Sequence, residues 1–198
     1  LIASLIPFAL SLVLWFGFNP DGTGYQFEEK YTWYAAIGSS LHLGVDGLSL
    51  TMVLLTTLLT PIALLASFNI SDRVKAYMML FLFLETGMLG VFMSIDLLIF
   101  FVFWEIGLVP MYFLINQWGS ANRNYASLKF MIYTMGGSLG LLLGIQLLGV
   151  LFQTFDLQTI VADWNNASGY LLGFPIETVK AVIFWMFVIA FAIKVPVW

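Results

Sequence analysis

Six apolar stretches, each close to the length of a membrane-spanning helix, constrain the fold of this sequence more than any other feature. They run from Leu1 to Phe18, Leu48 to Phe68, Ala76 to Met93, Asp96 to Trp118, Lys129 to Phe152 and Val179 to Trp198. A helix needs about 20 apolar residues to cross the hydrocarbon layer of a membrane. Only 9% of the 198 residues are charged, whereas soluble domains carry about 25%. The sequence therefore predicts an all-α integral membrane protein with about six spanning helices.

The loops between these stretches alternate in charge. The short turns that contain Arg73 and Arg123 carry cations, whereas the longer loops that contain Trp33 and Asp163 are mainly acidic. Because cationic loops stay on the side from which a membrane protein inserts, we expect Arg73 and Arg123 on the cytoplasmic, stromal or matrix side. Trp33 and Asp163 are then predicted on the opposite side.

The first long loop is predicted to form a hairpin at the outer membrane surface. It contains Tyr25, Phe27, Tyr31, Trp33 and Tyr34, and aromatic rings favour the headgroup region. His42 lies beside this loop and is predicted to be solvated or to cap a helix, not to bind a metal. We therefore expect residues 1–47 to form a flanking helix and a periplasmic or lumenal hairpin, and residues 48–198 to form the other membrane helices.

Glu105 is the candidate functional residue that the sequence marks most clearly. Counting about 1.5 Å per helical residue from Leu97 places Glu105 roughly 12 Å into the apolar layer. An ionised carboxylate costs several kcal/mol at such a depth, so its presence predicts proton or ion handling. Pro110 cannot donate to the carbonyl of Ile106, which leaves room for water or a hinge beside Glu105. The alternative is a permanently neutral carboxyl group bonded to a serine or threonine.

Lys194 is the second candidate, because it lies inside the last apolar stretch and two residues before Pro196. A proline interrupts a helix, and broken helices at membrane depth are tolerated mainly where they line a cavity. A lysine buried there titrates readily. Glu105 and Lys194 are therefore predicted to exchange between an ion pair and a neutral pair, as a proton relay requires. The alternative is that Lys194 marks a helix end and extends to the membrane surface.

Other charged residues in or beside the apolar stretches have weaker interpretations. Glu85 and Lys129 are each either a relay site or a structural charge, and Lys129 is also able to reach the nearby surface. Asp72 and Asp96 stand at the starts of stretches and are predicted to cap helices. Gly136, Gly137, Gly140 and Gly144 form a ladder with four-residue spacing, which predicts a closely packed neighbouring helix.

Several function classes are excluded by composition. Cysteine is absent and histidine occurs once, so these residues cannot hold a thiolate-bound iron–sulfur cluster or a His/Cys zinc site. The formal net charge of −4 argues against nucleic-acid binding. Redox chemistry is therefore not expected in these 198 residues.

Four motifs, in order, resemble one membrane-protein family. They are Gly44-Val-Asp-Gly-Leu-Ser49, Phe103-Trp-Glu-Ile-Gly-Leu-Val-Pro-Met-Tyr112, Arg123-Asn-Tyr-Ala-Ser-Leu-Lys129 and Phe191-Ala-Ile-Lys-Val-Pro-Val-Trp198. This order is similar to the antiporter-like membrane subunits of complex I, the proton-pumping NADH:quinone oxidoreductase. The block after Glu105 resembles the subunit M branch, which corresponds to mitochondrial subunit 4 and to the D subunit of the photosynthetic relative.

The resemblance implies a fold and a set of site residues. The family fold consists of two inverted five-helix repeats, each with one discontinuous helix, and this chain would hold most of the first repeat with its break at Lys194 and Pro196. The resemblance implies that Glu105 and Lys194 form the proton-translocating pair. It also implies partners of the L, N, K, A, J and H types, which would carry the flavin, iron–sulfur clusters and quinone, and no cofactor in this chain.

The implied function is that of a non-redox proton-pumping subunit in a bacterial plasma membrane, thylakoid or mitochondrial inner membrane. A Na⁺/H⁺ antiporter subunit of a multi-subunit transporter is the main alternative. A structural membrane subunit whose charges only hold helices together is a third. Both chain ends are expected to be truncations of a longer protein, because the first residue is Leu1 and the last apolar stretch ends directly after a Lys-Pro break.

Overall fold

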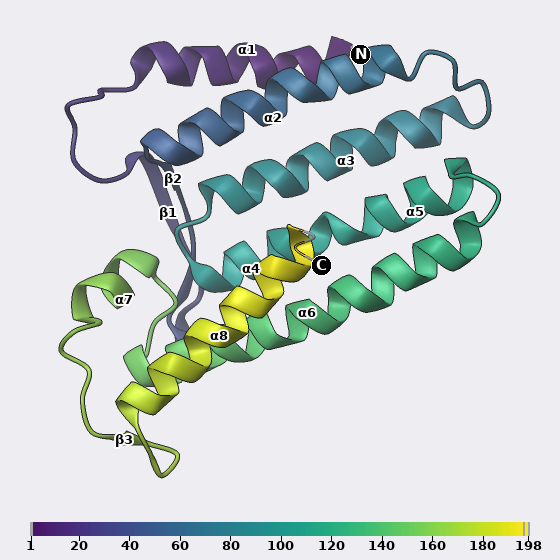
Figure 1. The fold of residues 1–198 in the computed structure, drawn as a ribbon. Coiled ribbons are helices and arrows are strands. Elements are labelled where there is room, and N and C mark those ends of the chain that lie inside the picture. The colour runs from purple at the N-terminus through teal and green to yellow at the C-terminus, as the bar shows by residue number, and fades with distance from the viewer. Residues whose placement is uncertain (1, 196, 198) are drawn as a thin grey trace.

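Figure 1 shows a row of helices lying side by side, with a strand pair and a short helix at one end. The structure is a computed structural model and describes residues 2–195 and residue 197. The helices are α1 (Ile2–Gly17), α2 (Gly47–Ala66), α3 (Val74–Met93), α4 (Leu97–Ile106), α5 (Leu108–Trp118), α6 (Arg123–Phe152), α7 (Leu157–Asp163) and α8 (Ile176–Lys194). The strands are β1 (Gln26–Tyr34), β2 (Ser39–Val45), β3 (Tyr170–Leu171) and β4 (Phe174–Pro175), with a 3₁₀ turn η1 at Ala35–Ile37.

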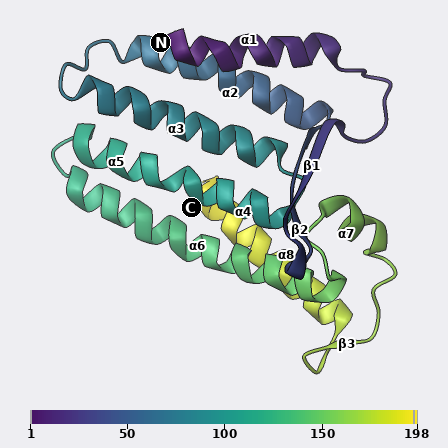
Figure 2. The same cartoon turned by 180° about the vertical axis from the view of Figure 1, so that it is seen from behind.

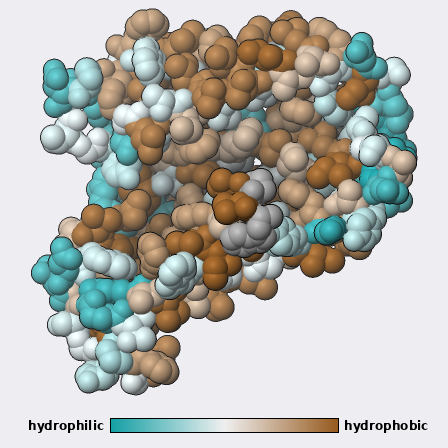
Figure 3. All heavy atoms as spheres, viewed as in Figure 1, coloured by the Kyte–Doolittle hydropathy of each residue, from teal (hydrophilic) through white to brown (hydrophobic). Residues whose placement is uncertain are grey.

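The helices confirm an integral, multi-pass membrane protein. Five spans are long and apolar enough to cross a membrane among the residues that the structure describes, namely α2, α3, α4 together with α5, α6 and α8. Helix α1 is apolar but has only 16 residues, and it packs along α2. In Figure 3 hydrophobic atoms cover the middle of the molecule, while hydrophilic atoms gather towards its ends. This distribution fits a bundle that crosses an apolar layer.

Helices that follow one another in the chain pack against one another. Helix α3 packs on α2 and on the pair α4 and α5, and α6 packs on α5 and α8. Gly137, Gly140 and Gly144 of the ladder face α8, because a Cβ at Gly137 would lie 2.8 Å from Ile193 and one at Gly144 would lie 2.9 Å from Phe187. The predicted close neighbour of this ladder is therefore α8.

A second close approach joins α3 to α4. A Cβ at Gly90 would lie only 2.1 Å from the ring of Phe103, a separation that no real side chain tolerates. Gly136, by contrast, lies on an exposed part of α6, where an added Cβ meets nothing within 4 Å among the described residues. The absence of a side chain at Gly90 therefore sets the distance between α3 and α4.

The first long loop forms the expected hairpin, built from antiparallel β1 and β2 with Lys30 opposite His42. Strand β2 contacts α2, α3 and α4, so the hairpin crosses the ends of these helices (Figures 1 and 2). At its tip, Gly38 has a φ of +70° and lies against the backbone of Gln153, where a Cβ would approach the carbonyl oxygen to 2.8 Å. Only glycine meets both conditions without strain.

Opposite ends of the bundle carry different connections. The α2–α3 and α5–α6 turns lie at one end, and the hairpin and α7 lie at the other in both views (Figures 1 and 2). Arg73 and Arg123 both contact Gln117, through its side-chain oxygen at 3.0 Å and its backbone carbonyl at 2.7 Å respectively. The two cationic turns are therefore neighbours, as one membrane face requires.

Helix caps follow the sequence prediction at one of the two expected sites. The Asp96 carboxylate accepts hydrogen bonds from the amides of Leu98 and Ile99 at the start of α4. The prediction for Asp72 is wrong, because α3 begins at Val74 and is preceded by Arg73 in a left-handed conformation without a side-chain cap. Asp72 instead presents its backbone carbonyl to the indole N–H of Trp118.

Cysteine labelling from each side of the membrane tests the orientation. These 198 residues contain no cysteine, and the protein without the substitution is the background control for single Arg123→Cys and Asp163→Cys variants. We expect impermeant maleimide to label Arg123→Cys from the cytoplasmic, stromal or matrix side only, and Asp163→Cys from the other side only. Labelling of both positions from the same side would contradict the orientation.

Substitution of Gly90 tests the close packing of α3 on α4. We expect Gly90→Ala to lower the free energy of unfolding by about 1–3 kcal/mol, because the added methyl group overlaps the Phe103 ring. Gly136→Ala is the matched control and is expected to leave stability unchanged or slightly raised. Thermal unfolding in detergent measures both, and equal stability of the two variants would show that the helices separate freely.

Candidate functional site

The helix that carries Glu105 is broken directly after it. Helix α4 ends at Ile106 and α5 begins at Leu108, with Gly107 between them. The Gly107 amide reaches the Phe103 carbonyl only at 3.4 Å, and Pro110 has no amide to offer the carbonyl of Ile106. The hinge that the sequence predicts beside Glu105 is thus present as an interruption between two helices.

Helix α3 covers this interruption closely. A Cβ at Gly87 would lie 3.1 Å from the amide nitrogen of Gly107, so the two backbones nearly touch. Irregular backbone at membrane depth is tolerated where protein buries it. The glycine in α3 therefore allows the break to exist inside the bundle, and Glu105 itself lies there half-buried.

Lys194 reaches the same region from the end of α8. Its ammonium donates to the Trp104 carbonyl at 3.3 Å and lies 4.5 Å from the centre of the Trp104 ring. Glu105 is within electrostatic reach of this charge, although no ion pair within 4.0 Å joins the two side chains in the described part of the chain. The structure therefore brings the two predicted residues together, with Trp104 as the direct contact.

Trp104 is a residue that sequence reasoning missed. Its indole N–H donates to the hydroxyl of Ser138 in α6 at 3.1 Å, and its ring packs against Phe191 of α8. The Trp104 side chain thus links α4 to α6 and α8, and its ring also contacts the Lys194 ammonium. Its position directly before Glu105 is the only signal in the sequence that points to this role.

A cavity of about 360 Å³ opens beside these residues. Trp104, Gly107 and Lys194 line it together with residues from α3, α5 and α6, and almost all of its other walls are apolar. Lys194 is exposed beside this cavity. Its contacts with the Trp104 carbonyl and ring place its charge next to Glu105.

The other two predicted site residues lie apart from this contact. Glu85 is buried, with 2% of its surface exposed, and interacts with Thr60 of α2. Its Oε1 has no hydrogen-bond partner among the described residues. Lys129 is exposed on α6 and lies 5.7 Å from the ring centre of Tyr125. The structure thus places Glu85 on the α2 side of α3, and Lys129 near the Arg123 turn.

Pro196, the residue expected to interrupt the last helix, lies outside the described residues. Helix α8 ends at Lys194, and the amide of Val195 still reaches the Phe191 carbonyl at 2.8 Å. The lysine therefore occupies the last helical position of α8.

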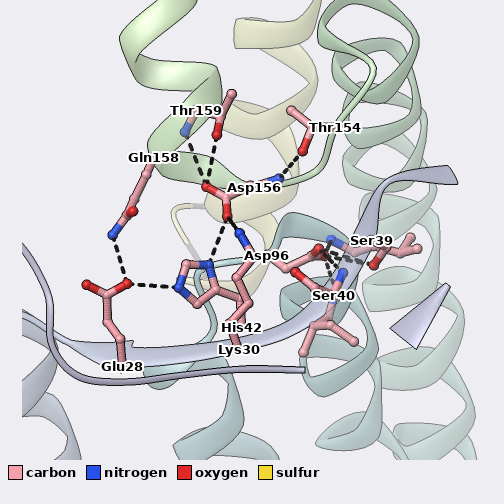
Figure 4. Close-up of polar contacts among 12 residues, drawn as sticks. Glu28, Lys30, Ser39, Ser40, His42, Asp96, Thr154, Asp156, Gln158 and Thr159 are labelled. Carbon is pink, nitrogen blue, oxygen red and sulfur yellow. Dashed lines mark hydrogen bonds and ion pairs between the residues drawn. The ribbon is translucent and has the colours of Figure 1, made fainter. Parts of the chain in front are cut away.

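A second polar cluster lies outside the spans, between the hairpin and α7 (Figure 4). The ring of His42 lies 2.9 Å from Asp156 through Nδ1 and 2.9 Å from Glu28 through Nε2. Lys30 donates to the same Asp156 oxygen at 2.6 Å. The prediction for His42 is therefore wrong: only 3% of its surface is exposed, and it caps no helix.

The start of α4 belongs to the same junction. Asp96 is fully buried and accepts hydrogen bonds from the hydroxyl of Ser39 and the amide of Ser40, in addition to those of its own helix. The backbone continues the contact, because Ile95 donates to the His42 carbonyl at 2.9 Å. The helix that carries Glu105 is thus anchored to the hairpin at its first turn.

Electrostatics favour the ionised form of Asp156. Burial alone would raise its pKa, but hydrogen bonds from Lys30, Thr159 and His42, and the charge of Lys30, outweigh burial and hold the pKa below its ordinary value. Opposite charges and hydrogen-bond donors stabilise a carboxylate in this way. The junction therefore depends on the negative charge of Asp156.

Comparisons with known proteins agree on one family. Residues 94–198 match the family model described as "NADH:quinone oxidoreductase/Mrp antiporter, TM". The chain belongs to this family. NADH-quinone oxidoreductase subunit M of Rhodobacter capsulatus is 39% identical over 100% of this chain and 39% of the relative. NADH-ubiquinone oxidoreductase chain 4 of Marchantia polymorpha is 38% identical over 98% of this chain and 37% of the relative. The chain thus spans less than half the length of these relatives.

Solved structures give the same family fold. Respiratory complex I from Thermus thermophilus with bound NADH contains a chain with a TM-score of 0.81 and 27% identity, covering 98% of this chain and 38% of that one. The Mrp complex from Dietzia matches with a TM-score of 0.80 and 22% identity, over 96% of this chain and 20% of that one. At 22% identity, the match to the Mrp complex shows only a shared fold. The antiporter-like helical fold expected from the motifs is therefore confirmed.

In this family member, acid is expected to weaken the outer junction through Asp156. A carboxylate with a lowered pKa stabilises the folded state above its unfolded-state pKa, and this contribution is lost as the pH falls through the folded-state value. Asp156→Asn should cost about 1–3 kcal/mol at neutral pH and should lose less further stability than the wild type below about pH 4. Thermal unfolding against pH measures this, with the exposed Asp163→Asn as control. Parallel curves for wild type and Asp156→Asn would contradict the assignment.

Proposed function

We propose that the chain is part of a proton-translocating membrane-arm subunit of a quinone-reducing NADH dehydrogenase, with Glu105 and Lys194 as its proton-transfer pair. The observation that carries the proposal is that Lys194 contacts Trp104, the residue directly before Glu105, beside a helix break and a cavity. The identity to subunit M and chain 4 relatives supports the choice of complex. In this proposal the chain is a non-redox translocase component.

The proposed step is a change of partner by the Lys194 ammonium. In the arrangement observed, the ammonium contacts the Trp104 carbonyl and ring and is near, but not paired with, Glu105. A carboxylate that loses a counter-ion in an apolar environment binds a proton, and it releases the proton when a cation returns. Movement of Lys194 towards and away from Glu105 would therefore load and unload a proton on the carboxyl group.

Trp104 has a positioning role in this proposal. Its ring stabilises a nearby cation by about 0.5–2 kcal/mol, which is small enough to be exchanged for a carboxylate contact. The hydrogen bond to Ser138 holds the ring in place while the ammonium moves. Glu85 and Lys129 do not contact the pair, and each is either a further relay site or a structural charge.

Partner subunits of the L, N, K, A, J and H types are proposed to surround the chain in its complex. They would hold the flavin, iron–sulfur clusters and quinone, because the chain has no cysteine to ligate a cluster. Among the described residues, no group of three His, Cys, Asp or Glu side chains is placed to hold a metal ion. The energy of quinone reduction would then reach Glu105 and Lys194 through the membrane helices.

A Na⁺/H⁺ antiporter subunit is the second candidate function, and the fold shared with the Mrp complex supports it. The two functions differ in the ion that must be present. Pumping that continues in sodium-free buffer and stops with a quinone-site inhibitor favours the first function. Exchange that requires sodium but no electron donor favours the second.

Substitutions at the pair test the proposal in the assembled complex. Glu105→Gln and Lys194→Ala should each lower proton-coupled quinone reduction about tenfold or more without preventing assembly, because each removes one charge of the pair. Glu105→Asp should retain partial activity. The double variant should be no worse than either single variant, since residues that act as a unit are not additive.

Glu85→Gln is the matched control, since it neutralises another carboxyl group buried in the same bundle. It should leave substantial pumping. Wild-type pumping in assembled Glu105→Gln complexes would refute the role of Glu105. Complete loss in Glu85→Gln, with normal assembly, would assign the central role to Glu85 instead.

A further inference from the structure

The hydrogen bonds around His42 require more protons than a neutral ring carries. Nδ1 lies 2.9 Å from an Asp156 oxygen and Nε2 lies 2.9 Å from a Glu28 oxygen. An ionised carboxylate only accepts hydrogen bonds, and a neutral imidazole has one N–H and one lone pair. One of the two contacts would therefore set a lone pair against a carboxylate oxygen unless an additional proton is present.

The surroundings of the two carboxylates favour their ionised forms. Asp156 accepts from Lys30 through one oxygen and from the Thr159 amide through the other. Its lowered pKa agrees with this. The side chain of Glu28 is 38% exposed and also accepts from Gln158 at 3.3 Å. The additional proton therefore belongs on the ring.

We propose that Glu28, His42 and Asp156 form a proton-binding site, in which a doubly protonated imidazole joins the hairpin to the segment that begins α7. The ligand of this site is a proton taken from the outer aqueous phase. The proposal holds whether or not Glu105 takes part in proton transfer, because the site lies outside the spans.

Charge balance supports the same assignment. Among the side chains that bond directly to one another in this cluster, Glu28 and Asp156 contribute two negative charges and Lys30 contributes one positive charge. A protonated ring makes the sum zero, whereas a neutral ring leaves one unbalanced negative charge beside a buried side chain. Buried charges persist in proteins when they are paired and hydrogen-bonded, so the protonated state is the one that fits this cluster.

Protons have a route to the site although His42 is buried. The side chains of Glu28 and Lys30 are 38% and 54% exposed, against 4% for His42. The charged groups that contact the ring or its carboxylate partners are Glu28 and Lys30 of β1 and Asp156 before α7. Tyr25 before β1 interacts electrostatically with Glu28, Asp156 and Asp46, and Asp96 before α4 adjoins Asp156 through an isolated β-bridge. Asp96 is satisfied by its own amide and hydroxyl donors and does not contact the ring.

Loss of the proton would loosen a junction of three segments. The His42 carbonyl accepts from Ile95, Phe155 accepts from Leu97, and Ile95 accepts from Leu157, so the hairpin, the start of α4 and the start of α7 are linked by backbone hydrogen bonds. When the ring becomes neutral, one carboxylate loses its donor and repels the ring lone pair. The junction is therefore expected to weaken as the pH rises.

Nitrogen NMR on the chain in lipid bilayers tests the protonation state. His42 is the single histidine of these 198 residues, and the ¹⁵N-histidine signals that disappear in His42→Gln are those of this ring. We expect two protonated ring nitrogens at neutral pH. As the pH is raised, one nitrogen should lose its proton, and in Glu28→Gln this loss should occur at a lower pH, because one carboxylate partner is gone.

Glu29→Gln is the matched control, since Glu29 is the exposed neighbour of Glu28 in β1 and should titrate like the wild type. One protonated and one unprotonated nitrogen in the wild type at neutral pH would overturn the proposal. The same pH of proton loss in wild type and Glu28→Gln would overturn it as well.

Hydrogen exchange provides a measurement that does not depend on a carboxylate variant. Protection factors of the β1–β2 amides, corrected for intrinsic rates, should fall about tenfold in the wild type over the pH range in which the ring loses its proton. In His42→Gln they should be low and independent of pH in this range. Wild-type protection that does not change with ring protonation would refute the proposal that the protonated ring holds the hairpin to the segment that begins α7.

Discussion

The break between α4 and α5 is the constraint on which the arrangement of the membrane site depends. A polar backbone group left unpaired in an apolar layer costs several kcal/mol, so such a break needs protein around it. The close approach of Gly87 to Gly107 supplies this cover from α3. Lys194 arrives from the other side and directs its ammonium at the Trp104 carbonyl, a backbone group in the last turn of α4. The interruption thus creates the acceptor and the space that the lysine uses.

The two ends of α4 differ in how firmly they are held. At its start, Asp96 is fully buried and bonded to both its own helix and the hairpin, and neighbouring backbone groups add further links. At its end, the Gly107 amide reaches the Phe103 carbonyl only at 3.4 Å, and a cavity lies beside it. Displacements of this helix are therefore expected to concentrate at the end that carries Glu105. A helix that is anchored at its start and less constrained at its end suits Glu105, which must change its partner in the proposed function.

Much of this architecture can be predicted from local patterns in the sequence. Apolar runs of the right length give the spans, and the proline at 110 indicates the interruption beside Glu105. The glycine ladder indicates a close helix but not which one. The junction around His42 could not be predicted, because its ring contacts Asp156 at a separation of 114 residues and no local periodicity encodes that distance. The prediction that Asp72 caps a helix is wrong because Arg73, in a left-handed conformation, precedes the start of α3 at Val74.

The charged groups of the two sites are held in different ways, and the difference bears on which of them can move. His42 and Asp156 are both buried and in contact at 2.9 Å, with Lys30 on the same Asp156 oxygen at 2.6 Å, so separating the ring from Asp156 leaves an unpaired charge in a buried site, at a cost of several kcal/mol. Lys194 instead rests on a carbonyl and an aromatic ring, with Glu105 nearby but unpaired. Among the residues that the structure describes, neither side chain of that pair forms an ion pair. A tightly paired cluster stabilises a junction, whereas a loosely paired one allows a charge to be exchanged at low cost, which is the property that proton transfer across an apolar layer requires.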